Sequence, residues 1–450
     1  MPSPITRRRF NRDALLAVAA VGCAPPEVSE SEPPTRLLVI TADDLGWRDL
    51  SSYGLASVAT PALDRLVNGG VSFDRAFDVV STCSSSRATL VTGQYPHTHG
   101  VTGLVHRNPE LSLDPAHPTS VRRFQEAGYA TAIQGKWHLS DLEGPEAFGY
   151  DRYLATDIDQ VIKNAFDATA FLQEQAERPW YLELNFMQTH RDVFGEFPQA
   201  EGFPVSPDDA PPPEYWGLPN WPGIREEVAG YLSRLRWMDA IVGDVLTELD
   251  RQAVFDDTVI AFISDNGPPF PGNKLTLYDR GVGTPLFVHW PAGLSPARHD
   301  TLVSSVDLAP TLLDLFDLPP LPASQGQSLR PLLEGEPWTP ADAVFSEMER
   351  HGGPIPTRAV RTERHKYIRN FDADPIGMGG ASGQDYVDDL AELPEHPWLL
   401  PRVPEELYDL DSDPLERANL VGQPEHADLL ASMRARLDAH LVATEDPRAP

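Results

Sequence analysis

The chain has 450 residues, of which 41% are hydrophobic and 23% are charged, a composition typical of folded rather than disordered proteins. Its formal net charge of −31 argues against nucleic acid as a partner, because an acidic surface repels phosphate. Two cysteines, Cys23 and Cys83, exclude a disulfide framework. The length allows several domains, or one large α/β domain with an appendage.

The first 23 residues are typical of an export signal. Three arginines at positions 7–9 precede an apolar run that ends at Cys23, and the run is shorter than the roughly 20 residues of a membrane-spanning helix. The arginine pair followed by Phe10 resembles a twin-arginine signal, and the small residues before Cys23 resemble a lipoprotein cleavage site. We therefore predict export to the periplasm or cell envelope, membrane contact through a lipid anchor on Cys23, and a tether over residues 24–35.

Strand-like and helix-like segments then alternate along residues 36–324, the predicted catalytic domain. Short apolar runs typical of buried strands occupy residues 37–41, 130–133, 180–184 and 258–263. Helical patterns occupy residues 60–67, 120–127 and 226–249. This alternation predicts a doubly wound α/β sheet.

The pattern changes near residue 325. Short strands over residues 358–369 and a final helix over 426–441 predict a smaller C-terminal α+β subdomain, residues 325–450. A proline-rich stretch over residues 203–222 predicts a long loop, near the mouth of a site or at an interface.

Polar side chains follow four of the predicted strands. They are Asp43 and Asp44, then Lys136 and His138, then His190, then Asp265 and Asn266. Ligands of open α/β sheets bind beyond the carboxyl ends of the strands, so we expect these residues at one rim. The carboxylates and the amide form an all-oxygen set that favours Ca²⁺ or Mg²⁺ over zinc. Asp-Asp and Asp-Asn-Gly also form simple turns, but their place directly after apolar strands favours a metal site.

Cys83 precedes three serines, Arg87 and an apolar helical stretch. This order predicts that Cys83 begins a helix, where anions bind and a thiolate is stabilised. From the spacing alone, a buried structural cysteine in a serine-rich turn explains the pattern equally well.

Taken together, the motifs resemble the type I sulfatase family. Residues 83–87 with Thr92-Gly93 resemble its signature, and residues 43–44, 135–138, 190, 264–267, 307–311 and 406–410 match the family in the same order. Within the family the chain is most similar to the heparan N-sulfatases (sulfamidases), through residues 265–271, 277–278 and 284–285. One departure is Ser85, which stands where the signature has Pro or at times Ala.

The resemblance implies an alkaline-phosphatase-like mixed sheet and hydrolysis of N-sulfo or O-sulfo groups of sulfated sugars, as in glycosaminoglycan degradation. It implies that a formylglycine-generating enzyme oxidises Cys83 to formylglycine, whose hydrate is the nucleophile. It also implies one Ca²⁺, with Mg²⁺ as the alternative. The implied metal ligands are Asp43, Asp44, residue 83, Asp265 and Asn266.

The resemblance assigns further roles to side chains at the rim. Arg87, Lys136 and Lys274 would neutralise the sulfuryl group. His138 would orient the formylglycine, and His190 would protonate the leaving group.

Two other functions remain open on the sequence. A phosphatase or phosphonate monoester hydrolase would use a similar rim, because phosphoryl and sulfuryl transfer need similar charge stabilisation. An inactive glycan-binding lipoprotein is disfavoured, because a binding module needs no nucleophile.

The absence of a Lys/Arg run predicts a pocket that acts on the ends of sugar chains. His351 and Arg358 are the candidates for binding the sugar in this pocket. The sequence leaves the oligomeric state open.

Overall fold

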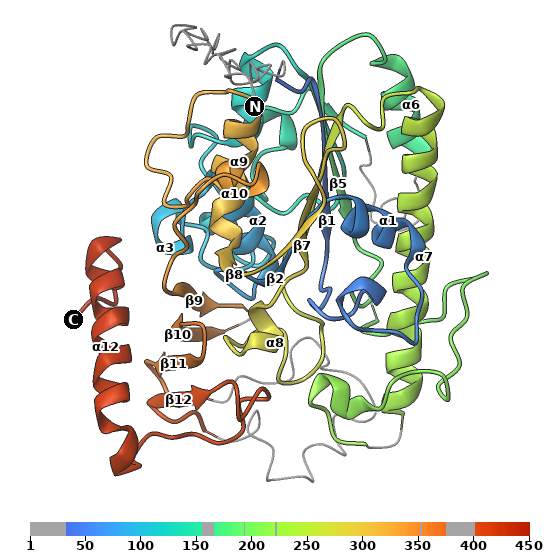
Figure 1. Cartoon of the computed structure of the whole chain (residues 1–450). Coiled ribbons are helices and arrows are strands. Elements are labelled where there is room, and N and C mark those ends of the chain that lie inside the picture. The colour runs from blue at the N-terminus through green and yellow to red at the C-terminus, as the bar shows by residue number, and fades with distance from the viewer. Residues whose placement is uncertain (1–32, 155–165, 193, 221–222, 352, 375–400) are drawn as a thin grey trace, which may run out of the picture. The chain divides into compact units, whose positions relative to one another are not determined.

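The computed structural model describes residues 33–154, 166–192, 194–220, 223–351, 353–374 and 401–450. The predicted export signal and Cys23 lie outside the described residues. Residues 33–450 form one compact unit that holds two β-sheets and their covering helices (Figure 1). No helix within the described ranges has both the length and the apolar character that crossing a lipid bilayer requires.

The larger sheet has eight strands in the order β4-β3-β5-β1-β6-β7-β2-β8. Its strands are β1 (Arg36–Ala42), β2 (Val71–Phe77), β3 (Ala130–Gly135), β4 (Arg152–Tyr153), β5 (Trp180–Phe186), β6 (Thr258–Ser264), β7 (Leu286–His289) and β8 (Ala297–Ser304). Only β7 runs antiparallel to its neighbours among these strands. The predicted doubly wound sheet is thus confirmed.

Helices cover both faces of this sheet (Figure 1). The helices of the described residues are α1 (Pro61–Gly69), α2 (Cys83–Thr92), α3 (Pro96–His99), α4 (Ser120–Glu126), α6 (Phe166–Glu174), α7 (Ile224–Arg251), α8 (Asp279–Val282), α9 (Leu308–Leu315), α10 (Arg330–Leu333) and α12 (Ala427–Ala443), of which α12 packs on the smaller sheet. Short 3₁₀ helices are η1 (Ser51–Tyr53), η2 (Pro109–Leu111), η3 (Pro145–Phe148), η4 (Pro213–Trp216), η5 (Ser305–Asp307) and η7 (Pro424–His426).

Strand β1 lies in the middle of the sheet and its side chains alternate between the two faces. Leu38 and Ile40 belong to the core that contains α1 and α7, whereas Leu37 and Val39 belong to the core that contains α2, α4 and α9. A strand buried on both faces explains the unbroken apolar run of its sequence.

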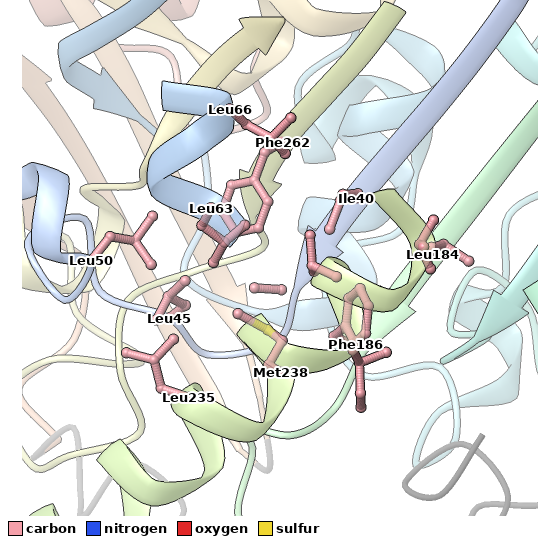
Figure 2. Packing of buried hydrophobic residues seen from close by; sticks show 14 of the residues in the cluster. Ile40, Leu45, Leu50, Leu63, Leu66, Leu184, Phe186, Leu235, Met238 and Phe262 are labelled. Atoms are coloured by element: carbon pink, nitrogen blue, oxygen red, sulfur yellow. The ribbon is translucent and has the colours of Figure 1, made fainter. Parts of the chain in front are cut away.

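Figure 2 shows the first of these cores from close by. Ile40 and Phe262 from the sheet, Leu63 from α1, and Leu235 and Met238 from α7 are all fully buried there. The predicted helix over residues 226–249 is confirmed as α7, extended by about one turn in total. This packing fixes the strands whose ends carry the polar residues.

The smaller sheet is antiparallel, in the order β12-β11-β10-β9. Its strands are β9 (Val344–Arg350), β10 (Pro354–Arg361), β11 (His365–Asn370) and β12 (Glu405–Asp409). One face packs on α12, where Met433, Leu437 and Leu441 join Val360, Tyr367 and Leu407 in a separate core. The expected C-terminal strands and final helix are present, and the boundary after residue 324 stays a prediction.

Candidate active site

The strand register brings the predicted rim together. Ala42, the last residue of β1, pairs with Phe186, the last of β5, and with Ser264, the last of β6. The residues that follow these three strands therefore emerge level with one another. Strand β3 also ends beside β5, with Gly135 opposite Asn185.

A glycine is required at that point. Gly135 has φ +96°, and a Cβ there would lie 2.0 Å from the carbonyl oxygen of Asn185, far inside van der Waals contact. The close approach lets the Lys136 amide donate to the same carbonyl oxygen at 3.2 Å. The Lys136 side chain is thereby anchored at the rim.

Asp43 and Asp44 are fully buried at the end of β1. Asp44 has φ 64°, a left-handed conformation that costs strain in a non-glycine residue and is found at functional sites. Its amide donates to Oδ1 of Asp265 at 3.1 Å, and the side-chain amide of Asn266 donates to its Oδ1 at 2.7 Å. The acidic and amide residues of two strand ends thus form one cluster.

Cys83 is the first residue of α2, as predicted. Its sulfur lies 3.5 Å from Oδ1 of Asp43, 4.0 Å from Oδ1 of Asp44 and 3.7 Å from Oδ1 of Asn266. Cys83 therefore begins a helix rather than lying in a serine-rich turn, and its buried sulfur faces the acidic cluster.

The expected thiolate stabilisation is also wrong. Burial raises the pKa of the Cys83 thiol to about 12, and the charges of Lys136 and Lys274 oppose this rise without cancelling it. A helix N-terminus favours an anion by a modest amount, whereas removing a thiolate from water beside carboxylates costs more. The unmodified side chain is a neutral thiol at pH 7.

Each of the three predicted cations pairs with one acidic residue of the cluster. Nζ of Lys136 lies 2.5 Å from Oδ2 of Asp43, and Nζ of Lys274 lies 2.5 Å from Oδ1 of Asp44. Arg87 donates from Nε to Oδ2 of Asp265 at 3.0 Å. All these side chains are buried, so their interactions are only weakly screened by solvent.

These pairs decide which carboxylate stays charged. Burial alone would raise the pKa of Asp43, but the charges of Lys136, His190 and Arg87 hold it well below its usual range. Burial and the neighbouring Asp43 raise the pKa of Asp265, with Arg87 acting against them. Asp43 is therefore a permanent anion between two cations.

Both predicted histidines lie at the same rim. His190 Nε2 lies 3.7 Å from Oδ2 of Asp44, and its Nδ1 contacts the carbonyl oxygen of Arg191 at 2.6 Å. His138 Nε2 lies 2.8 Å from Nδ1 of His106. Burial lowers the pKa of both His138 and His190, and Lys136 and Arg87 lower that of His138 further.

The cluster fits a bound cation. One ligand atom from each of Asp43, Asp44, Cys83 and His190 lies within 4.8 Å of the others. Oδ2 of Asp44 is buried and has no hydrogen-bond partner among the described residues, which is the expected state of an oxygen meant for a metal. Several carboxylate and amide oxygens suit Ca²⁺ or Mg²⁺.

The predicted proline-rich loop flanks the segment that carries Lys274. Its described part contains η4, and the carbonyl oxygen of Trp216 accepts a hydrogen bond from the Asn273 side chain at 3.0 Å. The rings of Trp216 and Phe270 lie 5.8 Å apart. The loop therefore supports the chain between Asn266 and Lys274.

Arg358 does not lie on the sugar side of the site, and that prediction is wrong. Its side chain is only 1% exposed and donates to Oδ2 of Asp446 at 2.6 Å and to Oε1 of Glu349 at 2.7 Å. A buried guanidinium with these partners is structural. His351 remains a candidate, because its Nδ1 is buried and has no hydrogen-bond partner among the described residues.

Sequence reasoning missed His106. It lies between α3 and η2, away from any predicted strand end, and contacts His138 only through the tertiary fold. The local sequence around it carries no signal that distinguishes it from a loop histidine.

Known proteins resemble this chain along most of its length. The sulfatase family model matches residues 35–318, and the model of the C-terminal region of N-sulphoglucosamine sulphohydrolase matches residues 272–376. Human N-sulphoglucosamine sulphohydrolase is 32% identical to this chain, over 92% of this chain and 91% of its own. Human arylsulfatase A is 29% identical, over 91% of this chain and 87% of its own.

Solved structures share the fold. A protein in complex with its substrate D-glucosamine-2-N,6-O-disulfate has a TM-score of 0.70 at 19% identity, covering 93% of this chain and 99% of the other. The phosphonate monoester hydrolase of Agrobacterium radiobacter has a TM-score of 0.71 at 21% identity, covering 91% of this chain and 96% of the other. The predicted alkaline-phosphatase-like mixed sheet is confirmed. On these matches the chain belongs to the sulfatase family of hydrolases.

Proposed function

We propose that this chain releases sulfate from sulfated sugars, with N-sulfo groups as its first substrates and O-sulfo groups as the alternative. The observation that carries the proposal is the surroundings of Cys83. Its sulfur faces Asp43, Asp44 and Asn266 on one side, and Nζ of Lys274 lies 3.2 Å away on another. A nucleophile at this position would attack a group held by Lys136, Lys274 and Arg87 and by a metal.

The nucleophile we propose is formylglycine made from Cys83 by a formylglycine-generating enzyme. When present, the aldehyde hydrate supplies one hydroxyl to attack sulfur and a second to expel sulfate, an exit that a thiol lacks. The neutral, buried thiol of Cys83 is a poor nucleophile as it stands. This is consistent with a need for modification.

Asp43, Asp44, Asp265, Asn266 and residue 83 would hold one Ca²⁺, or Mg²⁺. A bound ion of this kind supplies Lewis-acid polarisation of a sulfate oxygen. His190 lies beside this ligand set, because its Nε2 is 3.7 Å from Oδ2 of Asp44.

Lys136, Lys274 and Arg87 bind and neutralise the sulfuryl group in this proposal. Each cation is held in place by a carboxylate, so the donors are already oriented before the substrate arrives. Preorganised charges in a buried site stabilise developing negative charge without reorganising.

His138 orients residue 83, and His190 gives a proton to the leaving group. An amine leaving group needs that proton more than an alcohol or phenol does, because a free amide anion is a far stronger base. Burial lowers the pKa of His190, so the protonated ring is scarce at neutral pH.

The proposed class of sugar substrate is supported by the proteins to which this chain is similar. Human N-sulphoglucosamine sulphohydrolase matches 92% of this chain, and the C-terminal family match bears the same name. The N-acetylgalactosamine-6-O-sulfatase of Bacteroides thetaiotaomicron is 28% identical over 89% of this chain, which supports O-sulfo groups as the alternative.

The test compares release of inorganic sulfate from N-sulfoglucosamine and from glucosamine 6-sulfate, using protein produced together with a formylglycine-generating enzyme. We expect release from the N-sulfo sugar, and none from a Cys83→Ala variant. Release of sulfate from glucosamine 6-sulfate alone would show that the chain is an O-sulfatase. Faster turnover of a phosphonate monoester than of either sugar would favour the second candidate, which the fold shared with the Agrobacterium radiobacter enzyme supports.

We also propose that the site is a pocket that acts on terminal sugars. The net charge of −31 opposes approach of a polyanionic polymer, and the cations at the rim are committed to one sulfate. Sulfate release from end-sulfated and internally sulfated oligosaccharides of equal length tests this. Equal rates on internal groups would show an open groove.

A further inference from the structure

Two histidines at the rim are joined edge to edge. Nδ1 of His106 lies 2.8 Å from Nε2 of His138, and their ring planes differ by 14° with centroids 5.1 Å apart. The centroid separation exceeds the nitrogen separation by about the two ring radii, so the rings lie nearly in one plane and share a well-aligned hydrogen bond.

The two rings differ in their surroundings. His106 is exposed in the chain between α3 and η2, whereas Nδ1 of His138 is buried and has no partner among the described residues. Burial, Arg107 and Lys136 lower the pKa of His106, and burial, Lys136 and Arg87 lower that of His138, which favours the neutral form of both rings. Between two neutral imidazoles only one nitrogen carries the shared proton, and the bond therefore fixes the tautomer of each ring.

We propose that His106 is a positioning residue whose Nδ1–H donates to Nε2 of His138, leaving His138 with a proton on Nδ1 that it donates to a sulfuryl oxygen carried by residue 83, and so orients that residue. The surroundings favour this direction. Lys136 and Arg87 stand beside His138 and build a site for an anion, and an unprotonated Nδ1 would repel that anion. The inference rests on the proposed function, because it takes a sulfuryl oxygen as the acceptor.

The opposite direction is chemically distinct. If Nε2–H of His138 donated to His106, Nδ1 of His138 would carry a lone pair and could only accept a proton. His138 would then contact a hydroxyl rather than an anionic oxygen. The tautomer of His138 decides between the two arrangements.

Nuclear magnetic resonance of the full chain with ¹⁵N-labelled histidine reads that tautomer without turnover. The His138 signals are assigned by their loss in a His138→Gln variant. We expect a protonated Nδ1 and an unprotonated Nε2 in the unsubstituted protein at neutral pH. A protonated Nε2 would overturn the proposal, whatever substrate the enzyme turns over.

Two substitutions separate positioning from packing. His106→Asn keeps an N–H donor close to the place of Nδ1, whereas His106→Phe keeps a planar ring without a donor. We expect His106→Phe to lower kcat by about 10–100-fold, as loss of a supporting hydrogen bond does elsewhere, with a mixed His138 tautomer and a smaller change in KM. His106→Asn should retain most of kcat and the Nδ1-protonated tautomer.

His365→Asn, in β11 of the smaller sheet, is the matched control and should leave kcat and the His138 signals unchanged. Unchanged kcat and tautomer in folded His106→Phe would overturn the proposal. So would equal losses in the Phe and Asn variants. Absence of sulfate release from the unsubstituted protein would instead count against the proposed function, and the tautomer measurement would still decide the role of His106.

Discussion

The ammonium nitrogen of Lys274 lies 3.2 Å from the sulfur of Cys83. The same nitrogen lies 2.5 Å from Oδ1 of Asp44, so one cation contacts both the nucleophile position and a candidate metal ligand. Burial would lower the pKa of Lys274, but Asp44 and the other anions of the site raise it. Lys274 is therefore charged at every working pH, and it is placed to bind the group that residue 83 attacks.

Replacing Lys274 by Met should lower kcat/KM by about 100–1000-fold, the usual cost of losing one preorganised donor to developing charge. Lys274→Arg should retain more activity, because the charge remains. Steady-state sulfate release measures both. Activity of the Met variant within about threefold of the unsubstituted enzyme would show that Lys274 does not contact the reacting group.

Ca²⁺ should raise the melting temperature of metal-stripped protein, because an ion that binds only the native state stabilises it. Asp44→Asn should abolish this rise and the activity, since it removes charge from an oxygen pair at the centre of the site. Asp257→Asn, at an exposed position, is the control and should behave like the unsubstituted chain. Full activity after exhaustive chelation would contradict the metal site.

Ser85→Pro should increase the fraction of Cys83 that is converted to formylglycine in cells that contain the converting enzyme. Ser85 is the third residue of α2, and the first turn of a helix tolerates proline because its N–H groups have no partner within the helix. Mass spectrometry of the peptide containing residue 83 measures conversion as a loss of about 18 Da, the change that turns a thiol into the aldehyde nucleophile. Equal conversion in both forms would show that Ser85 does not limit the modification.

Unconverted Cys83 should react slowly with iodoacetamide at pH 8. Burial raises the pKa of its thiol to about 12, and only the thiolate reacts. The rate should therefore keep rising with pH throughout the range 7–10, without the plateau that a thiol of ordinary pKa shows. Lys274→Met removes a cation that lowers this pKa, so alkylation at a given pH should slow further. A plateau below pH 9 would contradict the raised pKa.

Export should depend on the first 23 residues and anchoring on Cys23 alone. The full chain should fractionate with the cell envelope, and Cys23→Ala should yield exported protein that is not membrane-bound. Replacing Arg8 and Arg9, the arginine pair before Phe10, by lysine should retain the protein in the cytoplasm. Unprocessed native protein in the cytoplasm would contradict the predicted signal.

The rim of the site could be predicted from sequence because it depends on local patterns. Apolar runs that end in Asp43 or Asp265 mark strand ends, and parallel strands in register bring such ends together, as Ala42 and Ser264 show. The family resemblance added Lys274, which no strand pattern marks.

Other features depend on packing between distant segments. The burial that raises the pKa of Cys83 comes from residues far along the chain. Its position at a helix N-terminus, taken alone, therefore predicted a pKa shift of the wrong sign. Arg358 looked like a free cation, and only the fold shows its partners Asp446 and Glu349. His106 contacts His138, which lies 32 residues later in the chain. The sequence around either histidine does not predict this contact.

The pairing of Arg358 with Asp446 has a consequence for how the chain reaches its final state. Arg358 lies in the middle of the smaller sheet, yet its carboxylate partner follows 88 residues later, beyond α12. During synthesis the guanidinium first has Glu349 as its partner, at 2.7 Å, and it gains Asp446 only after α12 has been made; removing one partner of a buried ion pair is costly. A chain cut short before Asp446 would therefore leave Arg358 with only part of its anionic partners, and its smaller sheet should be less stable than that of a chain that extends through Asp446.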